Sequence, residues 1–172
     1  MTAATTRPVA FTIHPALRVP IAAGGIALSA VGALAVARGL AGLAPTYPYM
    51  REAAVAVHLA SVLPALPLGL WLLLARKGDA RHRALGRIWM LMMLTAAISA
   101  VFIRHLNQGS FSLIHLFVPL TIYTIVLSVM AARAGNIAAH KAHLVRLYAI
   151  GLLVPGAFAF LPGRMMSLWL LG

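Results

Sequence analysis

Five long apolar stretches, separated by short polar connections, leave this chain few ways to fold. They cover residues 20–37, 55–75, 85–103, 115–132 and 147–162. A helix of about 20 apolar residues crosses the hydrocarbon core of a bilayer and satisfies its own backbone hydrogen bonds there. The mean hydropathy of +0.95 and the charged fraction of 9% agree with burial in lipid. We therefore expect an all-α integral membrane protein with about five transmembrane helices.

The length of the chain limits it to one such bundle. Its 172 residues are almost used up by five spans, so little remains for a soluble domain. We predict a single transmembrane domain over residues 1–172. Its parts are a cytoplasmic N-terminal segment (1–19), a first helix and linker (20–54), two helical hairpins (55–103 and 115–162) and a short interfacial tail (163–172) anchored by Trp169.

Two halves of the chain repeat one another. His58 opens the second span and His115 opens the fourth, and each span leads into a basic connection that holds another histidine, His82 in the first case and His140 in the second. A repeat of this kind predicts two like-oriented helical hairpins that form a four-helix core. The hairpins then place two histidines at one membrane face and two at the other.

Lysine and arginine fall mostly on one side of the predicted spans. Because basic residues gather on the cytoplasmic side, we predict an inner-membrane protein with a cytoplasmic N terminus and a periplasmic C terminus. The net charge of +12 then reflects topology and attraction to anionic lipids, and argues against nucleic-acid binding. Ten of the 14 basic residues lie on the inner side (Arg7, Arg18, Arg76, Lys77, Arg81, Arg83, Arg87, Arg133, Lys141, Arg146), and four on the outer side (Arg38, Arg51, Arg104, Arg164).

Cysteine is absent and acidic residues are scarce. Without cysteine the chain has no disulfide, no thiolate metal site, no iron–sulfur cluster and no covalent c-type haem. The two carboxylates, Glu52 and Asp79, border spans on opposite faces, so paired-carboxylate chemistry is excluded within one protomer. The same shortage argues against an ion-driven transporter, which uses acidic groups inside the membrane. Any ligation of a metal must come from nitrogen or oxygen.

Histidine is the residue type in excess, with seven copies against two acids. Imidazole is a good axial ligand for haem iron, and helix bundles place such ligands on facing helices. The repeat pairs His58 with His115 at the outer face and His82 with His140 at the inner face, with His143 as the alternative inner ligand. Haem propionates need cationic partners at the membrane edge. Suitable arginines are Arg81, Arg83, Arg87 and Arg146 on the inner side and Arg104 and Arg164 on the outer side.

Several short motifs are distributed over the four predicted core helices and their connections. They are Val57-His58, residues 82–90, Phe102-Ile103-Arg104, residues 109–116, Gly135-Asn136-Ile137 with His140, and residues 161–166. These motifs resemble a bacterial predicted membrane protein family of unknown function, numbered 2306. The resemblance covers about residues 53–167 and implies no established activity. The helix arrangement is also similar to transmembrane dihaem cytochromes b, which implies one haem between helices two and four and another between helices three and five.

Three hypotheses about function stay open. The leading one is a protein that binds haem b, with two haems, and carries electrons across the membrane or to a quinone. The second is a zinc or copper site of three imidazoles, His58, His105 and His115, with Glu52 nearby in the sequence. The third is a cofactor-free accessory subunit. The expected partners are the lipid bilayer, a quinone, and a second copy or a larger membrane complex; enzymatic activity is left open.

Overall fold

The computed structural model describes residues 15–75 and 78–172, and every regular element in them is a helix. The predicted N-terminal segment before residue 15 lies outside the described residues, as do Arg76 and Lys77. In chain order the elements are α1 (Pro15–Leu40), η1 (Pro48–Arg51), α2 (Ala53–Leu74), α3 (Ala80–Ala100), η2 (His105–Asn107), η3 (Leu113–Leu116), α4 (Phe117–Arg133), α5 (Ile137–Tyr148), η4 (Ala149–Leu153), α6 (Val154–Phe158) and α7 (Met165–Leu171).

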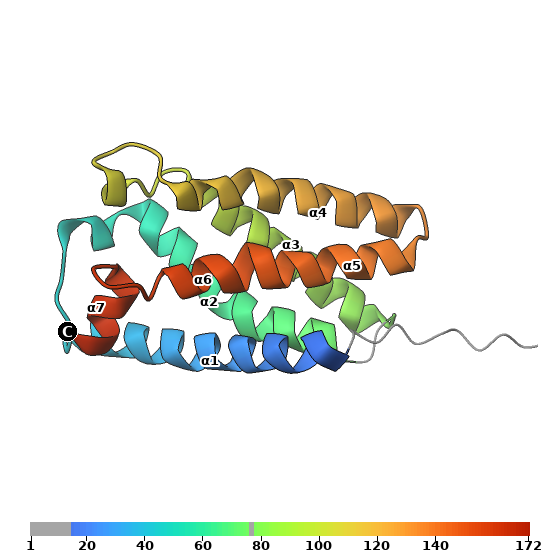
Figure 1. The fold of residues 1–172 in the computed structure, drawn as a ribbon, viewed down its shortest axis with the longest axis horizontal. Helices are drawn as coiled ribbons and strands as arrows, with labels where there is room; N and C mark the ends of the chain where they lie inside the picture. The colour runs from blue at the N-terminus through green and yellow to red at the C-terminus, as the bar shows by residue number, and fades with distance from the viewer. Residues whose placement is uncertain (1–14, 76–77) are drawn as a thin grey trace, which may run out of the picture.

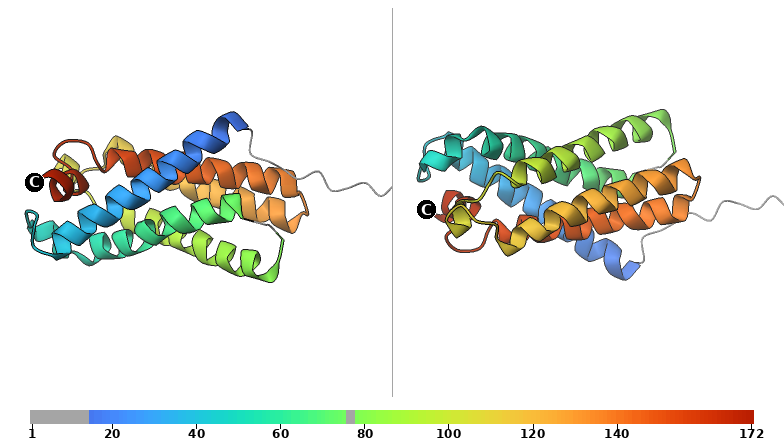
Figure 2. Two further views of the ribbon diagram at one scale, coloured as in Figure 1. Left: turned by 90° about the horizontal axis from the view of Figure 1, so that it is seen from below. Right: turned by 90° about the horizontal axis from the view of Figure 1, so that it is seen from above.

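The long helices alternate in direction along the bundle, and α1 crosses the others obliquely (Figure 1, Figure 2). α5, η4 and α6 form one continuous rod. The start of α1, the end of α2, the start of α3 and the α4–α5 turn lie together at what we call the loop end. The start of α2, the segment from residue 101 to residue 116, and α7 lie at the opposite end, which we call the cavity end. The described parts of the basic connections therefore share the loop end.

Within the described residues, four helices are long and apolar enough to cross a membrane. They are Ala16–Leu40, Ala53–Leu74, Leu113–Arg133 and Ile137–Phe158. The prediction of an all-helical membrane protein is thus confirmed. α3 is as long as its neighbours, but three arginines in its first two turns lower its hydropathy, so the fifth span stays a prediction. These arginines are Arg81, Arg83 and Arg87.

The last span was predicted too late in the sequence. We expected it over residues 147–162, but the helix begins at Ile137, because the Asn136 side chain accepts a hydrogen bond from the Ala139 N–H (3.0 Å) and caps it. His140 and His143 therefore lie in a helix and not in a connection. Farther along, Pro155 has no N–H to offer the preceding turn, and the rod widens there into the π-helical turn η4.

The centre of the bundle is closed by four residues that we call the core layer: Ala65, Leu66, Trp89 and Tyr148. Trp89 of α3 donates its indole N–H to the Ala65 carbonyl of α2 (2.9 Å), and the Tyr148 hydroxyl donates to the Leu66 carbonyl (2.9 Å). Tyr148 is completely buried. The core layer thereby ties α3 and α5 to α2 with every polar side-chain atom in it hydrogen-bonded.

The C-terminal residues form a short helix against the end of α1. α7 packs on α1, and the Arg38 guanidinium donates hydrogen bonds to the carbonyls of Trp169 (3.1 Å) and Gly172 (3.1 Å). These carbonyls belong to a helix C-terminus, which favours a cation. Arg38 thus fixes α7 at the cavity end.

Candidate functional site

A cavity of about 380 Å³ opens inside the bundle at the cavity end. Its walls come from α2, α3, α4 and the rod of α5, η4 and α6, and they are mostly Leu, Val, Ala and Met side chains. A few polar groups interrupt this apolar lining, among them His58, His105, His115 and Arg164. A mostly apolar cavity of this size with a few polar groups has the character of a cofactor or ligand site.

His58 lies one and a half turns into α2 and is held from α3. Its Nδ1 lies 2.9 Å from the Ala96 carbonyl oxygen and 3.2 Å from the Ser99 hydroxyl. Because a carbonyl oxygen only accepts, Nδ1 must carry the proton, and Nε2 of the neutral ring keeps its lone pair. Nε2 makes no hydrogen bond within residues 15–75 and 78–172. The ring is therefore oriented by the protein with one nitrogen left for a ligand.

His115 lies in η3, just before α4, and is held by Ser112. Nδ1 lies 3.0 Å from the Ser112 N–H nitrogen and 3.2 Å from the Ser112 carbonyl oxygen. Ser112 thus offers a donor to an unprotonated Nδ1 and an acceptor to a protonated one. Nε2 is buried and has no hydrogen-bond partner in the described part of the chain. An unsatisfied buried nitrogen is costly, and a bound group is its natural explanation.

His105 contacts Glu52 and Tyr49, and not His58 or His115. Its Nε2 lies 3.0 Å from a Glu52 carboxylate oxygen, and its ring stacks on Tyr49 with centroids 4.8 Å apart. Burial and the neighbouring Tyr47 raise the pKa of Tyr49 above its ordinary value, so this phenol stays protonated at neutral pH. Within the described residues no three His, Asp or Glu side chains group closely enough to hold a metal ion.

The histidines that we predicted for the inner face lie at the loop end. Nδ1 of His140 is 2.9 Å from the Ser128 carbonyl oxygen, which links α5 to α4. His82 is in the first turn of α3, where its backbone N–H is capped by Asp79 (2.6 Å). His82, His140 and the alternative His143 do not line the cavity that His58 and His115 share. A second haem between His82 and His140 stays a prediction.

Of the arginines predicted to contact haem propionates, the following three differ in whether they line the cavity. Arg164, at the start of α7, lines the cavity. The Arg104 guanidinium instead lies over the Phe111 ring, 5.1 Å from its centroid, and Arg87 is exposed on α3 toward the loop end. The structure therefore brings together His58, His115 and Arg164 from the predicted set.

Sequence reasoning missed the groups that hold the histidines. Ser112 precedes His115 by three residues, which is the spacing of a helix capping box, and that signal was available. The Ala96 carbonyl and Tyr49 gave no such signal, because backbone carbonyls occur everywhere and Tyr49 reaches the cavity only through the fold of η1.

Comparison with known proteins gives one match. The family model described as Predicted membrane protein (DUF2306) matches residues 55–162, from the first turns of α2 past the end of α6. It includes His58, His82, His115 and His140 and leaves out α1. No curated protein and no solved structure matches the chain. Because the match covers well over half of the sequence, the chain belongs to the DUF2306 family of predicted membrane proteins.

Proposed function

We propose that this protein binds one haem b at the cavity end, with Nε2 of His58 and Nε2 of His115 as the axial ligands, and that it carries electrons within the membrane. The observation that supports this proposal most is that His58 and His115 each have only one ring nitrogen in a hydrogen bond within the described residues. Each ring is bonded through Nδ1 and has no hydrogen bond at Nε2 within the described residues, and both rings line one cavity.

Anchoring through Nδ1 suits an axial ligand. Histidines that ligate metals usually donate the other ring N–H to a carbonyl or carboxylate, which fixes the ring orientation and raises the basicity of the ligating nitrogen. The Ala96 carbonyl gives His58 this support directly. His115 obtains the same support in the tautomer that donates Nδ1–H to the Ser112 carbonyl (3.2 Å).

The rest of the lining suits a flat, mostly apolar macrocycle with two carboxylates. Ala96, Ala97 and Gly151 take little space in the cavity wall, and Met93 on α3 is almost completely buried. Arg164 lines the same cavity and provides the cation that a propionate requires. In the described residues, Glu52 is the only carboxylate at this end, and its contact is with His105.

A haem held by His58 and His115 would supply one-electron transfer. The residues of this chain orient the ligands, exclude water and balance charge. The mostly apolar walls of the cavity favour the less charged form of a redox centre. The quinone or protein that exchanges electrons with the site stays a prediction.

The test is an oxidised-minus-reduced absorbance spectrum of the purified protein, with a pyridine haemochrome assay for stoichiometry. We expect a haem b spectrum with at least one haem per chain, and the loss of one haem in His58→Ala and in His115→Ala. His105→Gln is the matched control, since it removes an imidazole at the same end but not a proposed ligand. A colourless protein, after expression with ample haem, contradicts the proposal.

A further inference from the structure

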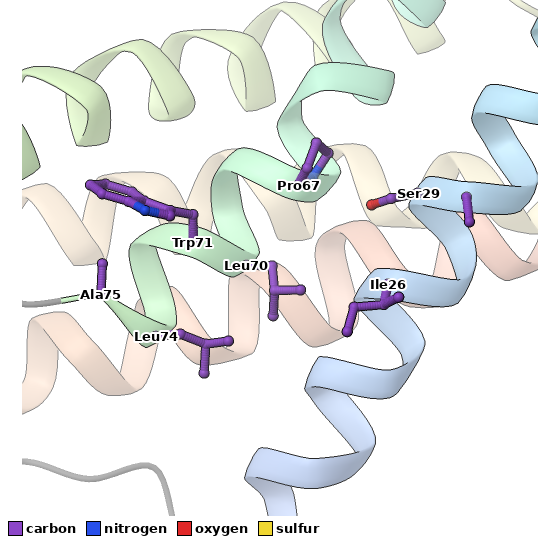
Figure 3. Close-up of a pocket in the computed structure, with 8 residues that line it drawn as sticks. Ile26, Ser29, Pro67, Leu70, Trp71, Leu74 and Ala75 are labelled. Atoms are coloured by element: carbon purple, nitrogen blue, oxygen red, sulfur yellow. The ribbon is translucent and has the colours of Figure 1, made fainter.

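An apolar groove lies on the outside of the bundle between α1 and α2, away from the histidines (Figure 3). It has a volume of about 700 Å³ and is formed by side chains such as Ile26 of α1 and Pro67 and Leu70 of α2. Ser29 is its polar member, and the Ser29 hydroxyl already donates to the Gly25 carbonyl (2.7 Å). The groove therefore provides apolar contact to a ligand, and its one polar side chain already has a hydrogen-bond partner.

The groove ends near the loop end, where the apolar part of α2 stops. Trp71, Leu74 and Ala75 form this end of its wall. The Arg81 guanidinium, from the first turn of α3, lies over the Trp71 ring at 5.2 Å from its centroid. Tryptophan and arginine are characteristic of the headgroup level of a membrane protein. The groove thus runs from the hydrocarbon region up to a cation at the membrane surface.

The cation at this position is available to an outside anion. Arg81 is exposed and forms no ion pair with a described residue. The nearest acid in the sequence is Asp79, whose carboxylate accepts the His82 N–H (2.6 Å) and caps α3. Arg81 therefore places at the end of the groove a positive charge that is complementary to a phosphate.

We propose that the groove is a binding site for an anionic phospholipid. One acyl chain lies along Ile26, Pro67 and Leu70, and the headgroup phosphate meets Arg81 above Trp71. The apolar groove alone would accept any lipid tail, and the unpaired arginine at its end gives the preference for an anionic headgroup. This proposal is independent of haem binding at the cavity end.

Trp71 provides a probe inside the proposed site. Trp71 is 37% exposed, whereas Trp89 is 3% exposed and buried in the core layer. The experiment reconstitutes the full chain into phosphatidylcholine–phosphatidylglycerol vesicles in which either the neutral or the anionic lipid carries brominated acyl chains, at equal bromine content. Bromine quenches tryptophan on contact. We expect at least a twofold stronger quenching by the brominated anionic lipid, and we expect Trp71→Phe to remove that difference.

Variants that each remove one positive charge distinguish a specific lipid site from general attraction of anionic lipids to the basic end of the protein. Arg81→Gln should abolish the preference for the anionic lipid and Arg81→Lys should retain most of it. Arg133→Gln, which removes one exposed charge at the same end on α4, should leave it unchanged. Equal quenching by both lipids, or an equal loss in Arg133→Gln, overturns the proposal. Protection of Trp71 from both lipids together with self-association overturns it too, because a second copy then fills the groove.

Discussion

The core layer and the cavity end both contain ring side chains that make hydrogen bonds to a backbone carbonyl of another helix. The two regions differ in whether the ring has a further polar atom without a partner. In both, an aromatic or imidazole side chain crosses between helices and bonds a backbone carbonyl: Trp89 to Ala65 and Tyr148 to Leu66 in the core layer, and His58 to Ala96 at the cavity end. In the core layer, the hydrogen bond satisfies the single polar atom of each side chain. At the cavity end, His58 and His115 each keep a second ring nitrogen that has no hydrogen bond within the described residues.

The difference distinguishes a polar group that stabilises the fold from one that awaits a ligand. A buried group with all its hydrogen bonds made adds to stability, while a buried group without a partner costs free energy in the empty protein. The unpaired Nε2 of His115 is such a cost. The two regions should therefore respond oppositely to mutation, in cofactor content and in stability.

The largest expected effect is the loss of haem from the cavity end. His115→Ala removes one axial ligand and should reduce the haem of that site to less than a tenth of its normal occupancy, measured by pyridine haemochrome per chain. The same variant without haem should unfold close to the haem-free parent, because removal of the unsatisfied Nε2 offsets the lost contact between Nδ1 and Ser112. A haem-free variant that unfolds well below the haem-free parent would place His115 with the core layer instead.

The second effect concerns packing in the core layer. A Cβ at Gly69 would lie 2.5 Å from Trp89 Nε1 and 2.7 Å from Tyr148 Cδ2, and both rings are held by hydrogen bonds to α2. Gly69→Ala should therefore cost about 1–3 kcal/mol and lower the thermal unfolding temperature in detergent. Gly86→Ala is the control, since nothing lies within 4 Å of a Cβ there; it should keep or slightly raise that temperature.

A smaller effect is expected from one hydroxyl of the core layer. Tyr148→Phe removes the donor to the Leu66 carbonyl while keeping the ring, and should destabilise the protein by about 1–2 kcal/mol. Haem content at saturating haem should stay the same. Thermal unfolding and the haemochrome assay on one preparation measure both. A selective loss of haem with unchanged stability would break the distinction between the two regions.

The smallest effect is expected at the rim of the cavity. The contact between His105 and Glu52 is partly exposed, and such pairs contribute at most about 1 kcal/mol. Glu52→Gln should therefore change neither the unfolding temperature by more than a few degrees nor the haem content. Zinc and copper analysis of the same sample tests the rival three-imidazole site. Bound metal lost in His105→Gln, in a protein without haem, would favour that rival.

Much of the fold was predictable because hydropathy acts over whole helices. The spans at residues 20–37, 55–75 and 115–132 fall inside α1, α2 and the η3–α4 segment with small changes at their ends. The start of α5 was missed because Lys141 and Arg146 reduce the apolar signal, whereas the Asn136 cap and the helix backbone bonds do not depend on it. Whether α3 crosses the membrane is not decided by its hydropathy, because its arginines also reduce the apolar signal.

The sequence alone determined the class of the protein, its helices and the residue type able to ligate a cofactor, because composition and spacing carry that information directly. It also placed His58 and His115 at the same end. Only the tertiary structure decided that these two line one cavity with Arg164, that His105 pairs with Glu52, and that His140 is bonded to Ser128. Those outcomes depend on which carbonyls and side chains meet when helices pack, and no spacing along the chain encodes such a contact.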